Sequence, residues 1–158
     1  MGLLAALRWQ VEETCKRANI GCTEHFPDDE PQFSRAGAIT LFRVVQEALA
    51  NVVKHASASE VEVAFEVTDE QVVLTVRDNG IGASPANLAR PRSHGIAGMR
   101  HRVHVLGGQL DISSEPGGGT HVRVRVPLTS VIQTESPDAD SSGTFAAIPG
   151  AERGGSTA

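Results

Sequence analysis

The sequence has few aromatic residues and few cysteines. It contains no tyrosine, one tryptophan and two cysteines among 158 residues, and aromatic residues make up only 4%. Cys15 and Cys22 fit neither a disulfide framework nor a CxxC metal-binding pair. We therefore expect two reduced thiols, with Cys15 on the apolar face of a helix.

An excess of positive charge is also missing. The formal net charge is −5, so nothing global indicates a nucleic-acid partner or contact of this chain with an anionic membrane. No signal peptide is visible, and no apolar run approaches the length of a membrane span. We therefore expect a cytoplasmic protein. Met1 leads at once into a helical pattern, which indicates either a short protein or a piece of a longer one.

The residues that are present suit one soluble domain with a core, since 40% are hydrophobic and 21% are charged. Apolar residues at helical spacing predict helices over residues 3–18, 35–56 and 95–106. Trp9 lies near the apolar stripe of the first helix. We expect it to pack there, although it could instead mark a face that other helices cover.

Alternating apolar residues predict the strands. They run through residues 61–67, 71–78, 110–112 and 122–126, and residues 20–26 suit a short edge strand. A glycine-rich hairpin turn lies at 115–119. Residues 83–94 lack periodicity and suit a mobile loop. From about Thr129 onward the composition favours a disordered tail.

Asp78 is the most informative residue. It closes a strand in which Val72, Leu74 and Val76 share one face, and the two-residue period puts Asp78 on that inward face. A buried carboxylate needs a partner, and a glycine-containing turn, 79–82, follows it. The pattern favours a polar ligand that donates a hydrogen bond. The alternative is an aspartate that only caps its own Asp-Asn-Gly turn.

Glu47, Asn51 and Lys54 lie on one face of the long predicted helix, at spacing i, i+4, i+7, with His55 at its margin. An acid, an amide and a base in one line suit a Mg²⁺ ion with a phosphate, because Mg²⁺ prefers oxygen ligands and lysine pairs with phosphate. The alternative is a solvated face with local ion pairs.

Two further patterns are weaker. Gly95 and Gly98 open the third helix, whose first backbone N–H groups suit an anion, although a plain glycine-rich loop has the same pattern. Thr120 is in register with the inward residues of the last strand. Its hydroxyl could recognise a nucleotide base together with Asp78, or could simply form a hydrogen bond within its own turn.

The order of these patterns resembles the ATP-binding domain of the gyrase, heat-shock chaperone, histidine kinase and mismatch-repair (GHKL) superfamily, the Bergerat fold. The resemblance covers about residues 35–127. Residues 42–56, FRVVQEALANVVKHA, resemble the N-box of two-component histidine kinases of the nitrate/nitrite-sensor type, and residues 98–119 fit that subfamily too. The resemblance implies an α/β two-layer sandwich: a mixed, mostly antiparallel sheet with helices on one face.

For the base, the resemblance implies that Asp78 accepts a hydrogen bond from the adenine amino group. Thr120 would assist through its hydroxyl or a water. Gly80 and Gly82 would let adenine and ribose approach the backbone.

For the phosphates, the resemblance implies that Asn51 holds Mg²⁺ and that Glu47 polarises a Mg²⁺-bound water or acts as a base. Lys54 and His55 would lie near the phosphates.

The segment 83–94 would be a short ATP lid that Gly95 and Gly98 hinge and shape, and the helix from Met99 would present N–H groups to phosphate. His101 stands where the family usually has an acid. We expect this position to be exposed.

The implied domain organisation is an N-terminal helix, edge strand and loop of the ATPase domain (1–34), a histidine-kinase-like ATP-binding core (35–128) and a tail (129–158). No histidine lies in a phosphoacceptor context. A dimerisation domain, upstream or in another chain, would therefore supply the acceptor, and a response regulator would be the indirect partner. Alternatives are an anti-sigma-type serine kinase, a plain ATPase, or a non-catalytic nucleotide-sensing or docking module.

Overall fold

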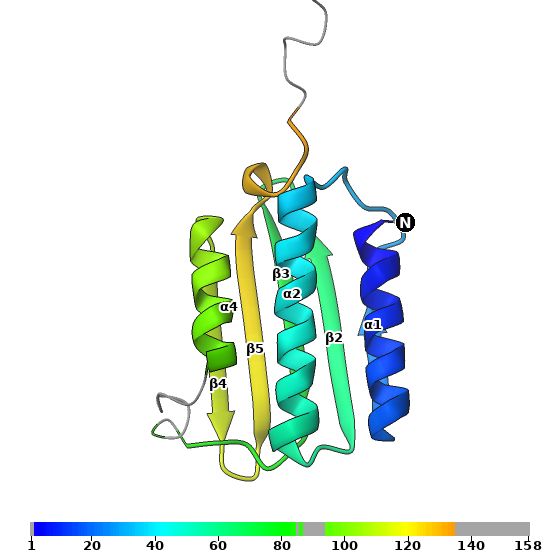
Figure 1. The fold of residues 1–158 in the computed structure, drawn as a ribbon, viewed down its shortest axis with the longest axis vertical. Helices are drawn as coiled ribbons and strands as arrows, with labels where there is room; N and C mark the ends of the chain where they lie inside the picture. The colour runs from blue at the N-terminus through cyan, green and yellow to red at the C-terminus, as the bar shows by residue number, and fades with distance from the viewer. Residues whose placement is uncertain (1, 85, 87–93, 135–158) are drawn as a thin grey trace, which may run out of the picture.

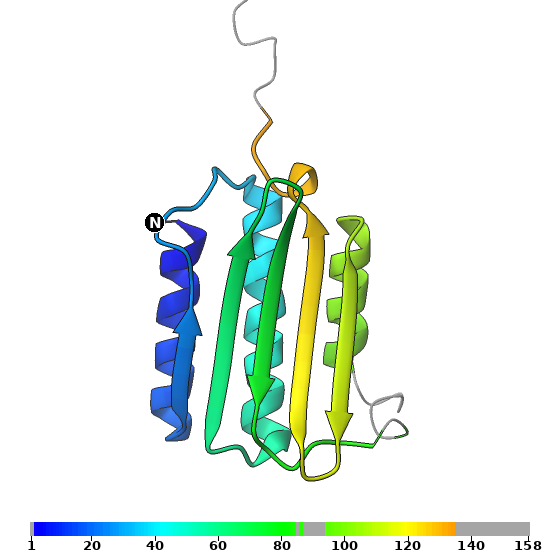
Figure 2. The same ribbon diagram turned by 180° about the vertical axis from the view of Figure 1, so that it is seen from behind.

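The protein is an open sheet covered by helices on one side. The computed structural model describes residues 2–84, 86 and 94–134. Five strands form one sheet in the order β1-β2-β3-β5-β4, and helices α1, α2 and α4 all lie on the same face of it (Figure 1). Figure 2 shows the opposite face, which none of the described helices covers. The predicted two-layer α/β architecture is confirmed.

The sheet is mixed. Its strands are β1 (Gly21–His25), β2 (Glu60–Val67), β3 (Gln71–Asp78), β4 (Gln109–Glu115) and β5 (Gly119–Pro127). The edge strand β1 runs parallel to β2, and every other neighbouring pair is antiparallel. The mostly antiparallel sheet and its short edge strand therefore agree with the prediction.

The helices match the apolar periodicity, with one change of pitch. They are α1 (Leu3–Ala18), α2 (Arg35–Asn51), the π-helix η1 (Val52–Ala56) and α4 (His94–Val105). The helix predicted over 35–56 is therefore not one α-helix, because its last turn is wound as a π-helix. In a π-helix the hydrogen bonds span five residues instead of four, so a face that follows α-helical spacing does not continue through it.

The core fills the space between the helices and the sheet. Phe65 lies near its centre at 1% exposure, with the rings of Phe26 and Phe33 packed against it at centroid distances of 6.3 and 6.0 Å. Residues 35–56 are long and apolar enough, by length and composition alone, to cross a membrane, contrary to the sequence-based expectation. The apolar stripe of α2 is packed in this core, as expected of a core helix.

The loop between β1 and α2 caps the N-termini of both α1 and α2. The first residue before α1 is Gly2, which has no side chain to cap the helix, and the Glu30 carboxylate takes that role by accepting from Leu4 N–H at 2.9 Å. Ser34 caps α2, because its hydroxyl accepts from Gly37 N–H at 3.0 Å. These acceptors satisfy N–H groups that have no partner inside the helix.

The chain remains ordered beyond residue 128, so the predicted start of the tail was wrong. The 3-10 helix η2 (Leu128–Ser130) follows β5, and Val131 is fully buried. Its carbonyl oxygen accepts from Ser34 N–H at 2.7 Å. A single apolar residue within a polar stretch anchors this segment, and average composition does not reveal it. Residues 135–158 lie outside the described part.

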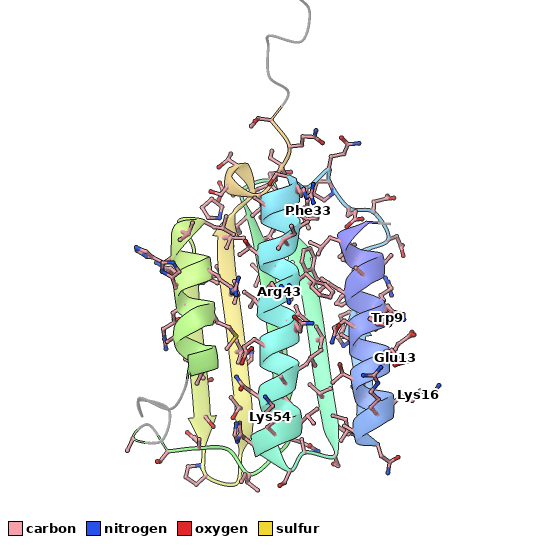
Figure 3. All side chains as sticks on the ribbon, in the orientation of Figure 1. Trp9, Glu13, Lys16, Phe33, Arg43 and Lys54 are labelled. Carbon is pink, nitrogen blue, oxygen red and sulfur yellow. The ribbon has the colours of Figure 1, made fainter. Side chains whose placement is uncertain are left out.

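Trp9 does not pack into the core, so that expectation was wrong as well. It is 57% exposed on the outer face of α1 (Figure 3). The reason is helical geometry, since Trp9 lies two residues from both Leu7 and Val11, which face the sheet.

The two cysteines are free thiols, Cys15 buried and Cys22 exposed. Burial of Cys15, together with the neighbouring Cys22 thiol, raises the pKa of Cys15 to about 12. Cys15 therefore stays protonated near neutral pH.

Thiol labelling should distinguish the two cysteines. At pH 8 we expect iodoacetamide to modify the folded chain once, at Cys22, because the thiolate is the nucleophile and Cys15 is both protonated and buried. Mass spectrometry of C22S should show an unlabelled protein until it is denatured. Labelling of Cys15 in the folded protein at the rate of Cys22 would contradict this environment.

Replacing Val131 tests whether the segment after β5 belongs to the core. Val131→Ala should lower the free energy of unfolding by about 2 kcal/mol, because it removes fully buried methyl groups and leaves a cavity. Val105→Ala is the matched control, since Val105 is 69% exposed, and should change little. Equal denaturation midpoints for the two variants would show that the segment does not contribute to the core.

Candidate nucleotide site

Asp78 ends β3 on the buried face of the sheet, as predicted. It is 6% exposed and is the one fully buried charged side chain among the described residues. Its Oδ1 accepts from Gly80 N–H at 2.8 Å and from Thr120 N–H at 3.3 Å. Within the described part of the chain, Oδ2 accepts no hydrogen bond. The aspartate therefore caps its own turn with one oxygen, and the other has no hydrogen-bond donor among the described residues.

Thr120 lies beside Asp78 at the start of β5, and Ser114 links to it. Thr120 Oγ1 and Ser114 Oγ lie 2.8 Å apart. Ser114 Oγ also accepts from Ala83 N–H at 2.7 Å. Ser114 was not identified from the sequence. Its alternation with Leu110 and Ile112 along β4 would have placed it on the inward face.

A pocket of about 320 Å³ opens at this end of the sheet. Its walls come from the ends of β3, β4 and β5 and from the hairpin between β4 and β5. It is lined by Arg77, Asp78, Ser113, Ser114, Glu115, Gly118, Gly119, Thr120 and His121. The predicted pair of Asp78 and Thr120 is thus brought together in one cavity with a polar lining.

The glycines of the turn after Asp78 are needed for contacts inside the protein. A Cβ on Gly80 would overlap the carbonyl oxygen of Ala56, and one on Gly82, whose φ is +67°, would overlap that of Glu115. Ile81 also fixes the turn against Ala56, because its N–H donates to Ala56 O at 2.7 Å. The fold itself therefore requires both glycines, and the approach of adenine and ribose to this backbone stays a prediction.

On the long helix, the structure separates the predicted line of polar residues. Glu47 and Asn51 lie on α2 and are half-buried, whereas Lys54 and His55 lie on η1 and are exposed. Because the π-helix begins directly after Asn51, Lys54 does not continue the face of Glu47 and Asn51. Figure 3 shows Lys54 at the end of this helix.

The start of α4 lies against Glu47. A Cβ on Gly95 would overlap the Glu47 carboxylate, so a glycine allows the helix to approach it. Gly98 is half-buried, yet no other described residue outside its own helix backbone lies within 4 Å of its Cβ position.

Met99 cannot present an N–H group to an anion as expected. It is 1% exposed and lies more than one turn inside α4, where backbone N–H groups already have helical partners. The free N–H groups belong to the residues from His94 onward. His101 is exposed, as predicted. Most of the predicted lid, 83–94, lies outside the described residues.

Sequence comparison identifies the family. A profile described as histidine kinase-, DNA gyrase B- and HSP90-like ATPase matches residues 36–130. The chain belongs to this family. It is 39% identical to the signal transduction histidine-protein kinase/phosphatase DegS of Bacillus subtilis over 82% of its length, which is 35% of DegS. It is 44% identical to the nitrate/nitrite sensor protein NarX of Escherichia coli over 55% of its length, which is 14% of NarX.

Solved structures agree on the fold. The histidine kinase domain of the Erythrobacter litoralis EL346 blue-light activated histidine kinase matches with a TM-score of 0.71 at 24% identity, covering 82% of this chain and 62% of that one. The chain spans only about a third of the length of two longer relatives. It covers 35% of DegS and 37% of the oxygen sensor histidine kinase NreB of Staphylococcus carnosus. The chain therefore matches only part of these longer kinases.

Two glycine substitutions test the geometry of the site without a ligand. Gly80→Ala should lower the free energy of unfolding by roughly 1–3 kcal/mol, because its Cβ meets a backbone carbonyl that has little room to move. Gly98→Ala should be neutral or stabilise by up to about 1 kcal/mol, since its Cβ would meet none of the other described residues and alanine favours a helix over glycine. Chemical denaturation measures both, and a Gly80→Ala variant as stable as the parent would contradict the clamped turn.

Proposed function

We propose that this chain binds ATP with Mg²⁺ and is the catalytic domain of a two-component sensor histidine kinase. It would transfer the γ-phosphoryl group to a histidine of a dimerisation domain. The observation that carries the proposal is the buried Asp78 carboxylate. Its Oδ2 accepts no hydrogen bond from the described residues, and Asp78 is one of the residues that line the pocket. Membership of the ATPase family supports a nucleotide as the donor to Oδ2.

The chemistry of the pocket favours adenine. Its exocyclic amino group would donate to Asp78 Oδ2, and the Thr120 hydroxyl lies on the same wall. Guanine carries a carbonyl at that position, so two acceptors would face each other. A buried carboxylate opposite a carbonyl would lose a charge-assisted hydrogen bond and gain nothing in exchange.

The residues present fit a magnesium ion. Glu47 and Asn51 offer a carboxylate and an amide oxygen on one half-buried face of α2. The described residues contain no cluster of three His, Cys, Asp or Glu side chains. The protein would therefore supply few ligands, and phosphate oxygens and water the rest, which is the usual pattern for Mg²⁺. The ion would neutralise phosphate charge, and Glu47 would orient a bound water or act as a base.

The phosphate chain would extend toward α2 and α4. Exposed Lys54 and His55 supply charge and hydrogen bonds at the end of η1. The first turns of α4 would supply free N–H groups and the positive end of the helix dipole, and none of the described residues blocks the approach to Gly98. Positioning and charge neutralisation are the main contributions that a protein makes to phosphoryl transfer.

The acceptor histidine would come from a dimerisation domain, in the same chain upstream or in another chain, and a response regulator would receive the phosphoryl group from it. The relatives named above support this, since DegS and NreB are histidine kinases by name and NarX is a nitrate/nitrite sensor protein. We expect this work to take place in the cytoplasm.

Replacing Asp78 tests the base contact. Asp78→Asn should weaken ATP binding by ~1.5–3 kcal/mol, the range for a charge-assisted hydrogen bond, because its amide is a poorer acceptor. Isothermal titration calorimetry measures the affinity, and thermal melting confirms the fold. Asp111→Asn is the matched control, since Asp111 is exposed and pairs with Arg125. Unchanged ATP affinity in Asp78→Asn would refute the assignment.

Phosphoryl transfer requires an outside acceptor. With radiolabelled ATP the isolated chain should stay unlabelled, and a dimerisation helix pair of this subfamily, added in trans, should gain an acid-labile, base-stable label. Asn51→Ala should abolish that label while adenosine still binds, because the amide would serve the metal and phosphates. A label on the isolated chain that disappears in His55→Ala would contradict the need for an outside acceptor.

A further inference from the structure

The Ser114 hydroxyl joins three parts of the site. Ser114 lies on the inward face of β4 and lines the same pocket as Asp78. Its Oγ accepts from Ala83 N–H at 2.7 Å, lies 3.1 Å from the carbonyl oxygen of Gly119 and lies 2.8 Å from Thr120 Oγ1. Three polar contacts therefore meet at one oxygen atom.

The direction of these hydrogen bonds follows from counting hydrogens. A serine hydroxyl has one hydrogen to donate and two lone pairs to accept with. The amide of Ala83 occupies one lone pair. The Gly119 carbonyl can only accept, so it receives the Ser114 hydrogen. All three contacts are hydrogen bonds only when Thr120 donates its own hydroxyl hydrogen to Ser114.

This arrangement determines what Thr120 can offer a ligand. Its hydrogen is held by Ser114, so Oγ1 can offer a ligand only its lone pairs. Asp78, which lines the same pocket, has a second acceptor in Oδ2, because both backbone N–H groups that reach it among the described residues bind Oδ1. An exocyclic amino group carries two hydrogens and can satisfy two acceptors, directly or through a water. A carbonyl oxygen can satisfy neither.

We propose that Ser114 is a positioning residue that holds the Thr120 hydroxyl as an acceptor and thereby makes the pocket select purines with a 6-amino group. This inference rests on the proposed function of the site as a nucleotide pocket. The same hydroxyl anchors the backbone at Ala83, directly after the turn that follows Asp78. A base that required a donor from Thr120 would have to break one of the three contacts at Ser114.

The test compares ATP with inosine triphosphate, which carries a carbonyl at C6 and an N–H at N1. The measured quantity is the ratio of the two affinities by calorimetry, in the presence of Mg²⁺. Ser114→Ala should reduce the preference for ATP about tenfold, the equivalent of one hydrogen bond, because the freed Thr120 hydroxyl can rotate and donate. Ser114→Thr restores a hydroxyl and should restore the preference.

Two further variants separate positioning from a general structural effect. Ser130→Ala removes an exposed hydroxyl at the opposite end of β5 and should leave the ratio at the parental value. Thr120→Val should also lower the ratio, and adding Ser114→Ala to it should lower the ratio no further. A further fall in the double variant would overturn the proposal, because Ser114 would then act by another route.

The outcomes distinguish this inference from the proposed function. If Ser114→Ala weakens both nucleotides equally, or changes neither, the selecting role is wrong while the nucleotide site stands. If the parent chain binds neither nucleotide, the proposed function fails and the inference fails with it. A reduced ratio in Ser114→Ala, restored in Ser114→Thr, supports both.

Discussion

The hydrogen bonds that Asp78 Oδ1 accepts from Gly80 and Thr120 connect three segments of the site: the end of β3, the turn after it and the start of β5. A carboxylate on this face is costly to bury, and two backbone donors on one oxygen offset much of that cost. The other oxygen is thereby held in place without a partner among the described residues. Under the proposed function, stabilisation of the fold and recognition of the base would therefore depend on the same side chain.

The turn that follows Asp78 is held from both sides by backbone contacts. Gly80 lies against the last residue of η1, and Gly82 lies against the hairpin between β4 and β5. Ile81 bonds to both, accepting from Gly117 N–H at 2.6 Å and donating to Ala56 O at 2.7 Å. The π-helix therefore holds the turn in place, because the carbonyl of its last residue, Ala56, accepts the hydrogen bond from Ile81. The helix that carries the proposed magnesium ligands and the strand that carries Asp78 are connected through this contact.

Much of the fold follows from the sequence because its periodicities are strong. The bounds of α1, the inward side of β3 and the position of Asp78 all follow from apolar spacing. Features that depend on a single residue or on tertiary contacts could not be predicted from the sequence. Val131 is one apolar residue in a polar stretch, the change of pitch after Asn51 has no clear local signature, and the glycines of the turn face backbone that is distant in sequence. Ser114 was missed because a serine in a strand carries no motif, although alternation places it inward.

The claim that Asp78 reads the base can be tested most directly by nuclear magnetic resonance of the ¹⁵N-labelled chain. The amides of Gly80 and Thr120 donate to Asp78 Oδ1, so a new hydrogen bond at Oδ2 should redistribute the electron density of the carboxylate and shift both signals. On titration with ADP and Mg²⁺, we predict that the two amides shift in proportion to the bound fraction measured by calorimetry. Saturable binding of ADP that leaves both amide signals in place would contradict the account.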